Sequence, residues 1–241
     1  MSEQISTSQR LHEDLSRVIA STKAGERLPS EPLLAQRLGV SRATLRETMR
    51  TFETRGMINR RQGVGTFVTR PSHVIDSGLE VLESIETLAK NIDLQVAYGK
   101  LEVSCGPANQ EEADALGFVQ STEVIRVSRV ILAESRPVAY LVDVLQKDFF
   151  PCEAVEKEFS GSVLDLLLKR GEPPLVNSRC EICAVAATRE VARALNIQRG
   201  GSLLKFVSRL YTLTGEVVDY SLSYFLPGYF RFHVVRELTG K

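Results

Sequence analysis

The sequence predicts an α+β protein with a small helical N-terminal part and a larger part built on an antiparallel sheet. Apolar residues first recur with the period of helices and, beyond about residue 90, alternate as in strands. Charge is divided in the same way. Residues 1–70 hold 12 Lys or Arg against 7 Asp or Glu, whereas the remainder holds 18 against 23, and the whole chain is neutral. This division suggests that only the first part meets an anionic partner.

The composition is that of a chain able to bury a core, with 43% hydrophobic and 25% charged residues. No apolar run approaches the roughly 20 residues needed to cross a bilayer. The first residues, MSEQISTSQRLHEDLSR, lack the apolar core of a secretory signal. We therefore expect a cytoplasmic protein that does not contact the membrane.

The cysteine pattern offers one candidate metal site. Cys180 and Cys183 have the spacing that can begin a zinc site, but the sequence has no second such pair, and its histidines lie far away along the chain. The neighbouring residues read as a strand, in which this spacing sends the two thiols to opposite faces. We interpret both cysteines as small buried hydrophobes and expect no metal and no cofactor.

Two helices open the N-terminal part. Apolar residues at helical spacing place the first at about residues 5–22, and Gly25 ends it. The second lies in LPSEPLLAQRLG, where Ser30 is placed to cap it. Pro32 occupies the first turn, in which a missing N–H costs little, and Gly39 closes the helix.

A third helix is expected in SRATLRETMRTFETRG, capped by Ser41 and ending before Gly56. Its apolar stripe faces the other helices, so its basic side faces outward. Two helices joined by a short turn form a helix-turn-helix, whose second helix can enter the major groove of DNA. Arg42 and Arg46 then suit paired contacts to guanine, and the hydroxyl groups suit phosphates. The outward residues are Ser41, Arg42, Thr44, Arg46 and Arg50.

The next stretch, MINRRQGVGTFV, predicts a small β-hairpin that turns at Gln62–Gly65. Such a wing can lay its backbone amides, Arg60, Arg61 and Gln62 along a minor groove or a phosphate row. Taken alone, an arginine-rich helix is most often a solvated face and a glycine hairpin only a turn. Their consecutive order favours DNA binding.

The stretch from Leu28 to Val68, LPSEPLLAQRLGVSRATLRETMRTFETRGMINRRQGVGTFV, resembles the winged helix-turn-helix of GntR-family bacterial transcriptional regulators. The resemblance implies DNA contacts by Ser41, Arg42, Thr44, Arg46, Gln62 and Gly63. One departure is Pro32, where relatives commonly carry an arginine, so that contact is missing or supplied elsewhere, for example by Arg37. The complete set of expected DNA-binding residues is Ser30, Ser41, Arg42, Thr44, Arg46, Arg50, Arg60, Arg61, Gln62, Gly63 and Gly65.

The N-terminal part is expected to end at residue 70, followed by a linker at residues 71–78 and a second domain at residues 79–241. The segment TRPSHVIDSG has proline, glycine and no periodicity, which is typical of a linker. A helix is expected next, because Leu79, Leu82, Ile85 and Leu88 are spaced for one buried face. Beyond it we expect strands at LQVAYGKLEVSC and PLVNSRCEICAVAA, hairpins turning at 134–137 and 214–215, a last strand in YFRFHVVREL, and short helices in NQEEADALG, GSVLDLLLKRG and TREVARALNIQRGG.

An internal echo supports this reading. A short helix, a turn and a β-hairpin occur in EEADALGFVQSTEVIRVSRVILAESRPVAYLVDVL and again in EVARALNIQRGGSLLKFVSRLYTLTGEVVDYSLSYFL. Consecutive hairpins mixed with helices favour an antiparallel sheet with helices alongside it. The order is similar to the UTRA effector-binding domain of the HutC branch of the GntR family. That resemblance implies a chorismate lyase-like fold and dimerisation through this domain.

Polar groups on apolar strand faces mark where a ligand would bind. Arg129 shares a strand face with aliphatic residues and needs an anionic partner, which is either a fixed carboxylate or a ligand. Asp219, Ser223 and Phe225 share a face of another strand, which is either solvated or lines a cavity. Ser162 is either an ordinary helix cap or a group that holds an anion. The resemblance to UTRA domains favours ligand contacts, so the expected effector-binding residues are Arg129, Ser162, Asp219, Ser223 and Phe225.

Several departures from the UTRA pattern concern the expected ligand. Many sugar-phosphate sensors carry a glutamate at the position of Leu141 and tyrosines at those of Leu164 and Phe225, and Gly228 replaces an acid. Hydroxyl groups and a carboxylate are thus exchanged for apolar surface. We expect an effector that is less hydroxylated than an amino-sugar phosphate, such as an organic or amino acid with one anionic group.

These observations predict a ligand-responsive transcription factor that binds double-stranded DNA. The resemblance implies a repressor, which most members of the family are, and we expect a small anionic metabolite to release it from the DNA. A homodimer would place two winged helices on a pseudo-palindromic operator. One alternative is a chorismate lyase-like enzyme, which we do not expect because the sequence shows no catalytic constellation. The other is an effector-independent DNA-binding protein.

Overall fold

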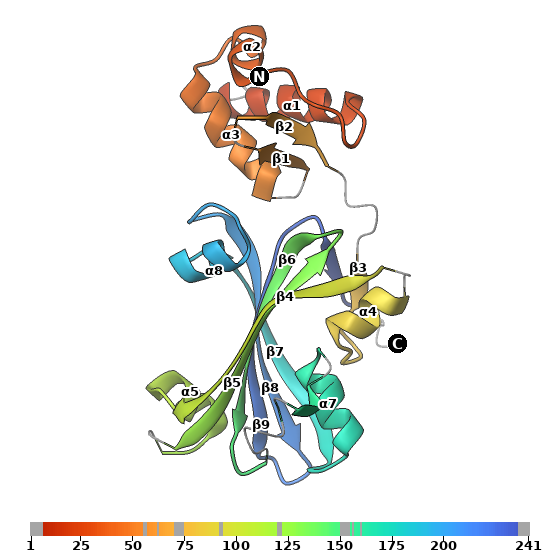
Figure 1. The fold of residues 1–241 in the computed structure, drawn as a ribbon, viewed down its shortest axis with the longest axis vertical. Coiled ribbons are helices and arrows are strands. Elements are labelled where there is room, and N and C mark those ends of the chain that lie inside the picture. Colours follow the sequence, from red (N-terminus) through yellow and green to blue (C-terminus); the bar gives the residue numbers. More distant parts are fainter. Residues whose placement is uncertain are drawn as a thin grey trace, which may run out of the picture.

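The computed structural model describes residues 7–54, 57–61, 63–69, 75–91, 94–119, 122–149, 155, 157–159 and 161–235. Figure 1 shows a small body of helices with a hairpin, joined to a larger body on a strongly twisted sheet. The division follows the change of hydrophobic period in the sequence. None of the helices in these ranges is long and apolar enough to cross a membrane.

Three helices form the small body: α1 (Thr7–Ser21), α2 (Glu31–Leu38) and α3 (Arg42–Thr54). Gly39 ends α2 in the left-handed conformation, at φ 66°. The Ser41 hydroxyl caps α3 by accepting a hydrogen bond from the Thr44 amide at 3.1 Å, as expected. Ser30 does stand at the N-cap position of α2, but its side chain makes no capping hydrogen bond. The three helices share one core, which includes Leu11, Leu15, Ile19, Leu34, Leu45, Met49 and Phe52.

The predicted wing is present as β1 (Ile58–Arg61) paired antiparallel with β2 (Gly65–Val68). The chain between α1 and α2 adds to its edge. Leu28 donates its amide to the Thr66 carbonyl, and Gly25 donates to Val68, both at 2.8 Å. The wing is therefore fixed to the helices by backbone hydrogen bonds as well as by the core.

The large body is an antiparallel sheet in the order β4-β5-β6-β9-β8-β7. Its strands are β4 (Val96–Pro107), β5 (Glu123–Ala133), β6 (Arg136–Gln146), β7 (Leu175–Ala186), β8 (Ser202–Thr212) and β9 (Val217–Phe225). The internal echo of the sequence is visible here, because β4-β5-β6 and β7-β8-β9 are matching halves that meet where β6 pairs with β9. The predicted α+β fold class is confirmed.

Helices cover both faces of this sheet. Figure 1 shows α5 (Gln110–Leu116) and α8 (Arg189–Ala194) on one side and α4 (Ile85–Asn91) and α7 (Val163–Arg170) on the other. Side-chain caps begin two of these helices: Asn109 and Glu112 make a reciprocal capping box on α5, and the Thr188 hydroxyl caps α8. The side with α4 and α7 borders a cavity in the large body.

The segment predicted to be a linker, residues 71–78, contains a strand that the sequence did not predict. Its last residues form strand β3 (Ile75–Gly78), which pairs in parallel with β10 (Phe230–His233). The final strand therefore lies outside the main sheet and is shorter than predicted. Sequence periodicity missed β3 because its partner is more than 150 residues away and supplies the backbone hydrogen bonds.

The helix expected from Leu79 begins only at Ile85. The hydroxyl of Ser84 accepts a hydrogen bond from the Thr87 amide at 3.0 Å, so it caps the helix at this point. Leu82, which had been assigned to the buried face, is 49% exposed. The apolar spacing over this segment was real, but a local cap and the preceding strand decided where the helix starts.

The prediction that Cys180 and Cys183 are buried is wrong, because both are exposed. They lie on β7, which has a neighbour on one side only. An edge strand is not covered as a central strand is, so its apolar residues are not forced into a core. The two thiols still point to opposite faces, as expected from their spacing, because only Cys180 lines the cavity described below.

Gly65 tests how the wing is attached. It has φ +137°, and a Cβ there would meet the Arg27 side chain at 2.3 Å. We predict that Gly65→Ala lowers the free energy of unfolding of the small body by up to about 3 kcal/mol. The control Gly39→Ala has positive φ but open space around it, so it should cost only about 1 kcal/mol. Urea unfolding measures both, and equal losses would contradict greater backbone strain at Gly65 than at Gly39.

Candidate nucleic-acid interface and ligand cavity

The outer side of α3 presents the residues expected to read DNA. Ser41, Arg42, Thr44, Arg46 and Arg50 are all exposed. The hydroxyls of Ser41 and Thr44 lie 2.8 Å apart at the start of the helix, where helix N-termini favour phosphate. Leu45, Met49 and Phe52 are buried on the opposite side. The arrangement places the basic side chains of α3 on the surface of the small body.

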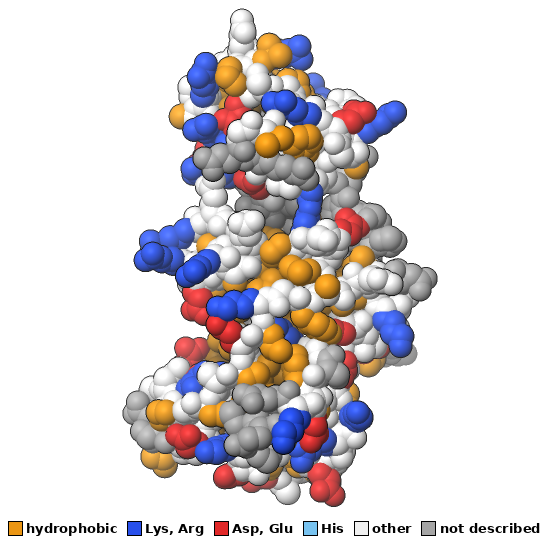
Figure 2. Space-filling view, viewed as in Figure 1, with side chains coloured by type: hydrophobic (Ala, Val, Ile, Leu, Met, Phe, Trp, Pro, Cys, Tyr) orange, Lys and Arg blue, Asp and Glu red, His pale blue; other side chains and the backbone are white. Residues whose placement is uncertain are grey.

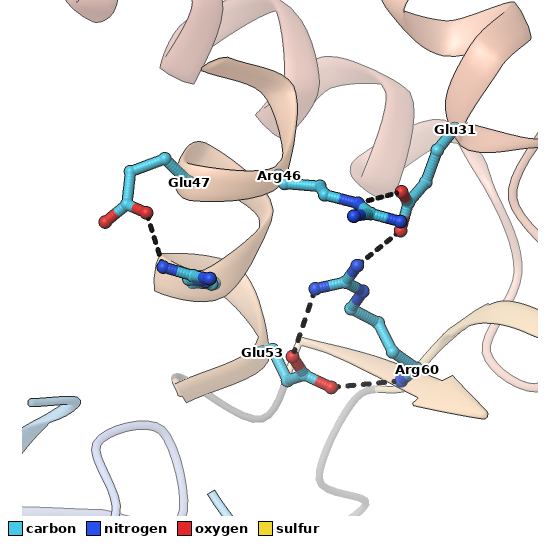
Figure 3. Close-up of polar contacts among 6 residues, drawn as sticks. Glu31, Arg46, Glu47, Glu53 and Arg60 are labelled. Carbon is cyan, nitrogen blue, oxygen red and sulfur yellow. Dashed lines mark hydrogen bonds and ion pairs between the residues drawn. The ribbon is translucent and has the colours of Figure 1, made fainter. Parts of the chain in front are cut away.

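Glu31 joins this helix to the wing (Figure 3). Its carboxylate accepts hydrogen bonds from Arg46 Nε at 2.7 Å and from Arg60 Nη2 at 2.5 Å. The Arg60 amide also donates to Glu53 at 3.2 Å. Burial favours a raised pKa for Glu31, but the hydrogen bonds from the two arginines outweigh it and lower the pKa. One carboxylate of α2 therefore fixes an arginine of the reading helix and an arginine of the wing.

The remaining expected DNA-binding residues are placed as follows. Arg50 pairs with Glu47 at 2.7 Å on the surface of α3. Gly63 and Gly65 form the wing tip with positive φ, and Ser30 is exposed beside it on the chain leading into α2. Arg61 ends β1, but its side chain and Gln62 lie outside the described residues. Sequence reasoning missed Glu31, although its place next to Pro32 at the start of α2 was visible.

The basic face borders a groove of about 800 Å³. One wall comes from the small body and includes Glu31, Arg46, Arg50 and Arg60. The other comes from Asn196–Gln198, which follow α8 in the large body. In this arrangement the DNA-reading face therefore looks toward the second domain.

A second cavity, of about 640 Å³, lies between the sheet and the segments that carry α4 and α7. The five residues expected to bind the effector all line it, although they come from two strands and a helix cap: Arg129, Ser162, Asp219, Ser223 and Phe225. The structure thus brings together side chains that lie far apart in the sequence. Apolar lining comes from Leu141, Leu164, Phe206 and Phe225.

Arg129 is buried and already has fixed partners. It forms an ion pair with Asp143 on β6 and a longer one, at 3.8 Å, with Glu86 on α4. The sequence left open whether this arginine meets a ligand or a fixed carboxylate, and the structure shows the fixed carboxylate. Sequence reasoning missed both partners. Asp143 could have been noticed as a lone acid between Leu141 and Leu145, whereas Glu86 lay on the helix expected around Ile85, and nothing in that helical pattern pointed to Arg129.

Asp219 lies beside this pair and is only 7% exposed. Its Oδ1 has no hydrogen-bond partner among the described residues, and neither carboxylate oxygen of Glu86 has one. Burial and then the neighbouring charge of Asp143 raise the pKa of Asp219 well above its usual range. Burial likewise raises the pKa of Glu86. The cavity therefore contains carboxyl groups that lack donors.

Ser162 acts as an ordinary helix cap in this structure. Its hydroxyl accepts a hydrogen bond from the Asp165 amide at 3.1 Å. The Asp165 carboxylate in turn accepts one from Ser84 at 2.8 Å. The N-terminus of α7 thus already carries a negative charge of its own, which disfavours a second anion there.

Comparison with known proteins now decides the family. Profiles of two families match the chain: bacterial regulatory proteins of the gntR family over residues 7–68, and the UTRA domain over residues 93–231. The HTH-type transcriptional regulator Rv0792c of Mycobacterium tuberculosis is 31% identical over 90% of this chain and 80% of its own length. The chain belongs to the GntR family. It is a DNA-binding regulator with a UTRA domain.

Other relatives of this GntR-family regulator are named as repressors. The transcriptional repressor NagR of Bacillus subtilis is 26% identical over 81% of this chain and 79% of its own length. The mannosyl-D-glycerate system repressor MngR of Escherichia coli is 25% identical over 95% of this chain and 93% of its own. The crystal structure of PhnF from Mycobacterium smegmatis matches with a TM-score of 0.63 over 94% of this chain and 99% of that one, at 20% identity, which shows a shared fold.

The Glu31 bridge in the GntR domain can be tested by its effect on specificity. Glu31→Gln frees two arginines and removes one negative charge from the reading face. We predict tighter binding to non-specific DNA, with a salt slope steeper by about one unit, and a smaller ratio of specific to non-specific affinity. The control Glu47→Gln removes a charge from α3 without touching the wing. Fluorescence anisotropy with operator DNA and with non-specific DNA, at several salt concentrations, measures these affinities. An unchanged ratio of specific to non-specific affinity in the Glu31 variant would show that the bridge does not position the arginines.

Asp219 of the UTRA domain should control how stability depends on pH. Its folded-state pKa is raised, so its contribution is fully present below the unfolded pKa of about 3.9 and is lost as the pH rises through the folded value. We predict that the wild-type protein loses free energy of unfolding over that rise and that Asp219→Asn loses less. Glu83→Gln, which alters an exposed carboxylate of the same cavity, should follow the wild-type curve. Urea unfolding at a series of pH values tests this, and identical curves for wild type and Asp219→Asn would contradict it.

Proposed function

We propose that this chain is a cytoplasmic, ligand-responsive repressor of the HutC branch, which binds a pseudo-palindromic operator as a homodimer and is released by a small-molecule effector. The observation that carries the proposal is the exposed basic side of α3 together with the wing. The proposed division is a DNA-binding domain at residues 1–70 and an effector-binding and dimerisation domain at residues 79–241. Residues 71–78 connect them and end in β3.

At the operator, Arg42 and Arg46 are the residues proposed to contact base edges, because they lie on the first turns of the reading helix. The hydroxyls of Ser41 and Thr44 suit phosphates. The wing tip with Gly63 would approach the adjacent backbone or minor groove. Arg60 has a different role, since its side chain is only 20% exposed and pairs with Glu31. We propose that it holds the wing against the reading helix.

Dimerisation is supported by the exposed apolar surface of the large body. Figure 2 shows hydrophobic side chains gathered at the surface over the middle of that body. Exposed large hydrophobic residues on the edge strands β4 and β7 include Tyr98, Leu101, Val176 and Ile182. Uncovered edges of this kind invite pairing with another chain. A symmetric dimer would carry two reading helices to half-sites about one helical turn apart.

The effector is proposed to bind in the 640 Å³ cavity. Two features link this cavity to the DNA-binding domain. Ser77 and Gly78 of β3 line it, and β3 is the first described element after the wing. In addition, a duplex on the reading face would have to displace Asn196–Gln198 from the groove. A shift between the two domains, biased by the ligand, would change operator affinity about 5–150-fold for a coupling of roughly 1–3 kcal/mol.

The repressor function is supported by the relatives named as repressors, NagR and MngR. The anionic effector expected from the sequence loses its main support in the structure. That expectation rested on Arg129 and on the Ser162 helix terminus, and both already face a carboxylate.

Operator binding tests the proposal. In gel-shift titrations with DNA from upstream of the gene, we predict that Arg42→Ala and Arg46→Ala each weaken specific binding by about 1–3 kcal/mol, or roughly 5–150-fold. The control Arg17→Ala removes an exposed arginine of α1 and should bind as the wild type does. Affinity should also fall steeply with salt. Wild-type affinity in folded Arg42 and Arg46 variants would overturn the proposed interface.

A further inference from the structure

We propose that the effector carries a protonated nitrogen, which the carboxyl groups of Asp219 and Asp143 bind at the centre of the cavity. This inference rests on the proposed function, because it names the ligand class of the same cavity. It replaces the anionic metabolite expected from the sequence.

The charges lining the cavity are mostly negative. The charged lining residues that the structure describes are one arginine, Arg129, and five acids: Glu80, Glu83, Glu86, Asp143 and Asp219. Low-dielectric walls focus such a charge distribution onto whatever enters. An anionic ligand would therefore enter against the field, whereas a cation would be attracted.

The single arginine is not available to offset this field for a ligand. Its guanidinium pairs with Asp143 and lies 3.8 Å from Glu86 at the nearest atoms. Its pKa is raised: burial opposes the charged form, but the charges of Asp143 and Glu86 outweigh burial. Its Nε has no hydrogen-bond partner among the described residues, but that atom lies 3.8 Å from Glu86, so an anion bound there would sit against a buried carboxylate, which is unfavourable.

Asp219 lacks a hydrogen-bond donor that a ligand could supply. Its side chain is more than nine-tenths buried, it lines the cavity, and its Oδ1 has no partner among the described residues. A buried polar atom of this kind costs free energy unless something donates to it. A hydroxyl group could donate, but only a cation would also reduce the repulsion between the neighbouring carboxyls of β9 and β6. An ammonium or amidinium group meets both needs.

The residues around Asp219 determine which kind of ligand body the cavity can accept. The charged groups that act on Asp219 are Asp143 on β6 and Arg129 on β5, and Glu86 on α4 in turn lies near Arg129, Asp143 and Asp165 of α7. Leu141, Leu164, Phe206 and Phe225 form apolar walls, two of them aromatic. Ser208, Ser221 and Ser223 offer hydroxyl groups on the same sheet face. The cavity thus fits an amine on an apolar or aromatic body.

Three probes of similar shape test which charge the cavity prefers in a ligand. Phenethylamine carries an ammonium group on a phenyl ring and short chain, 2-phenylethanol carries a hydroxyl group, and phenylacetate carries a carboxylate. Thermal shift and calorimetry at neutral pH measure their binding to the full-length wild-type protein. We expect phenethylamine to raise the Tm with increasing concentration, and the other two to have no effect at equal concentration.

Matched variants locate the binding. Asp219→Asn should abolish the response to phenethylamine, whereas Glu83→Gln, which removes the same charge from an exposed position of the cavity, should keep it. The wild-type comparison of the three probes stands even if a variant folds poorly. The proposal is overturned if phenylacetate stabilises the protein as well as the amine does, if phenethylamine has no effect, or if its effect survives in a folded Asp219→Asn protein.

Operator binding, measured with the same samples, distinguishes a failure of the proposed function from a failure of the proposed ligand class. If the protein binds its operator and phenylacetate is the probe that stabilises it, the regulator stands and only the ligand class falls. If operator binding is absent in the wild-type protein, the proposed function fails whatever the probes show. If phenethylamine binds through Asp219 and weakens operator binding, both proposals are supported together.

Discussion

A charged side chain that is withdrawn from water needs a partner, and both candidate sites of this protein are built on that requirement. In the DNA-binding domain, Glu31 holds Arg46 and Arg60, so two cations from separate elements keep a fixed relation. In the effector domain, Arg129 is compensated by Asp143 and Glu86. The first cluster is exposed and leaves positive charge at the surface. The second is buried, and it contains more carboxyl groups than its one arginine can satisfy.

The sheet topology explains why the second cluster exists. Asp143 lies on β6 and Asp219 on β9, and these strands join the two halves of the repeated unit. Each half alone would place one acid on an open sheet face, where water could solvate it. Pairing of the halves beneath α4 and α7 instead brings the two acids together in a cavity. The cavity that we propose binds a cation thus arises because a helix-and-hairpin unit occurs twice in the chain.

The two sites are connected through a segment that local sequence describes poorly. Strand β3 follows the wing, lines the ligand cavity and pairs with β10 near the C-terminal end of the described chain. A ligand that contacts β3 therefore acts on the chain that leads into the DNA-binding domain. This is a contiguous physical route, of the kind needed if occupancy of one domain is to bias the placement of the other.

The sequence by itself determined the helix-turn-helix, the wing, the hairpins and most caps, because these depend on apolar period and on residues within a few positions, such as Ser41 and Asn109. It also selected five side chains that line one cavity. Only the tertiary structure decided that Arg129 meets Asp143 and Glu86, that Ile75–Gly78 is a strand, and that Cys180 and Cys183 are exposed on an edge. Each of these depends on contacts between residues distant along the chain. The charge that a ligand meets is set by such contacts, which no local pattern contains.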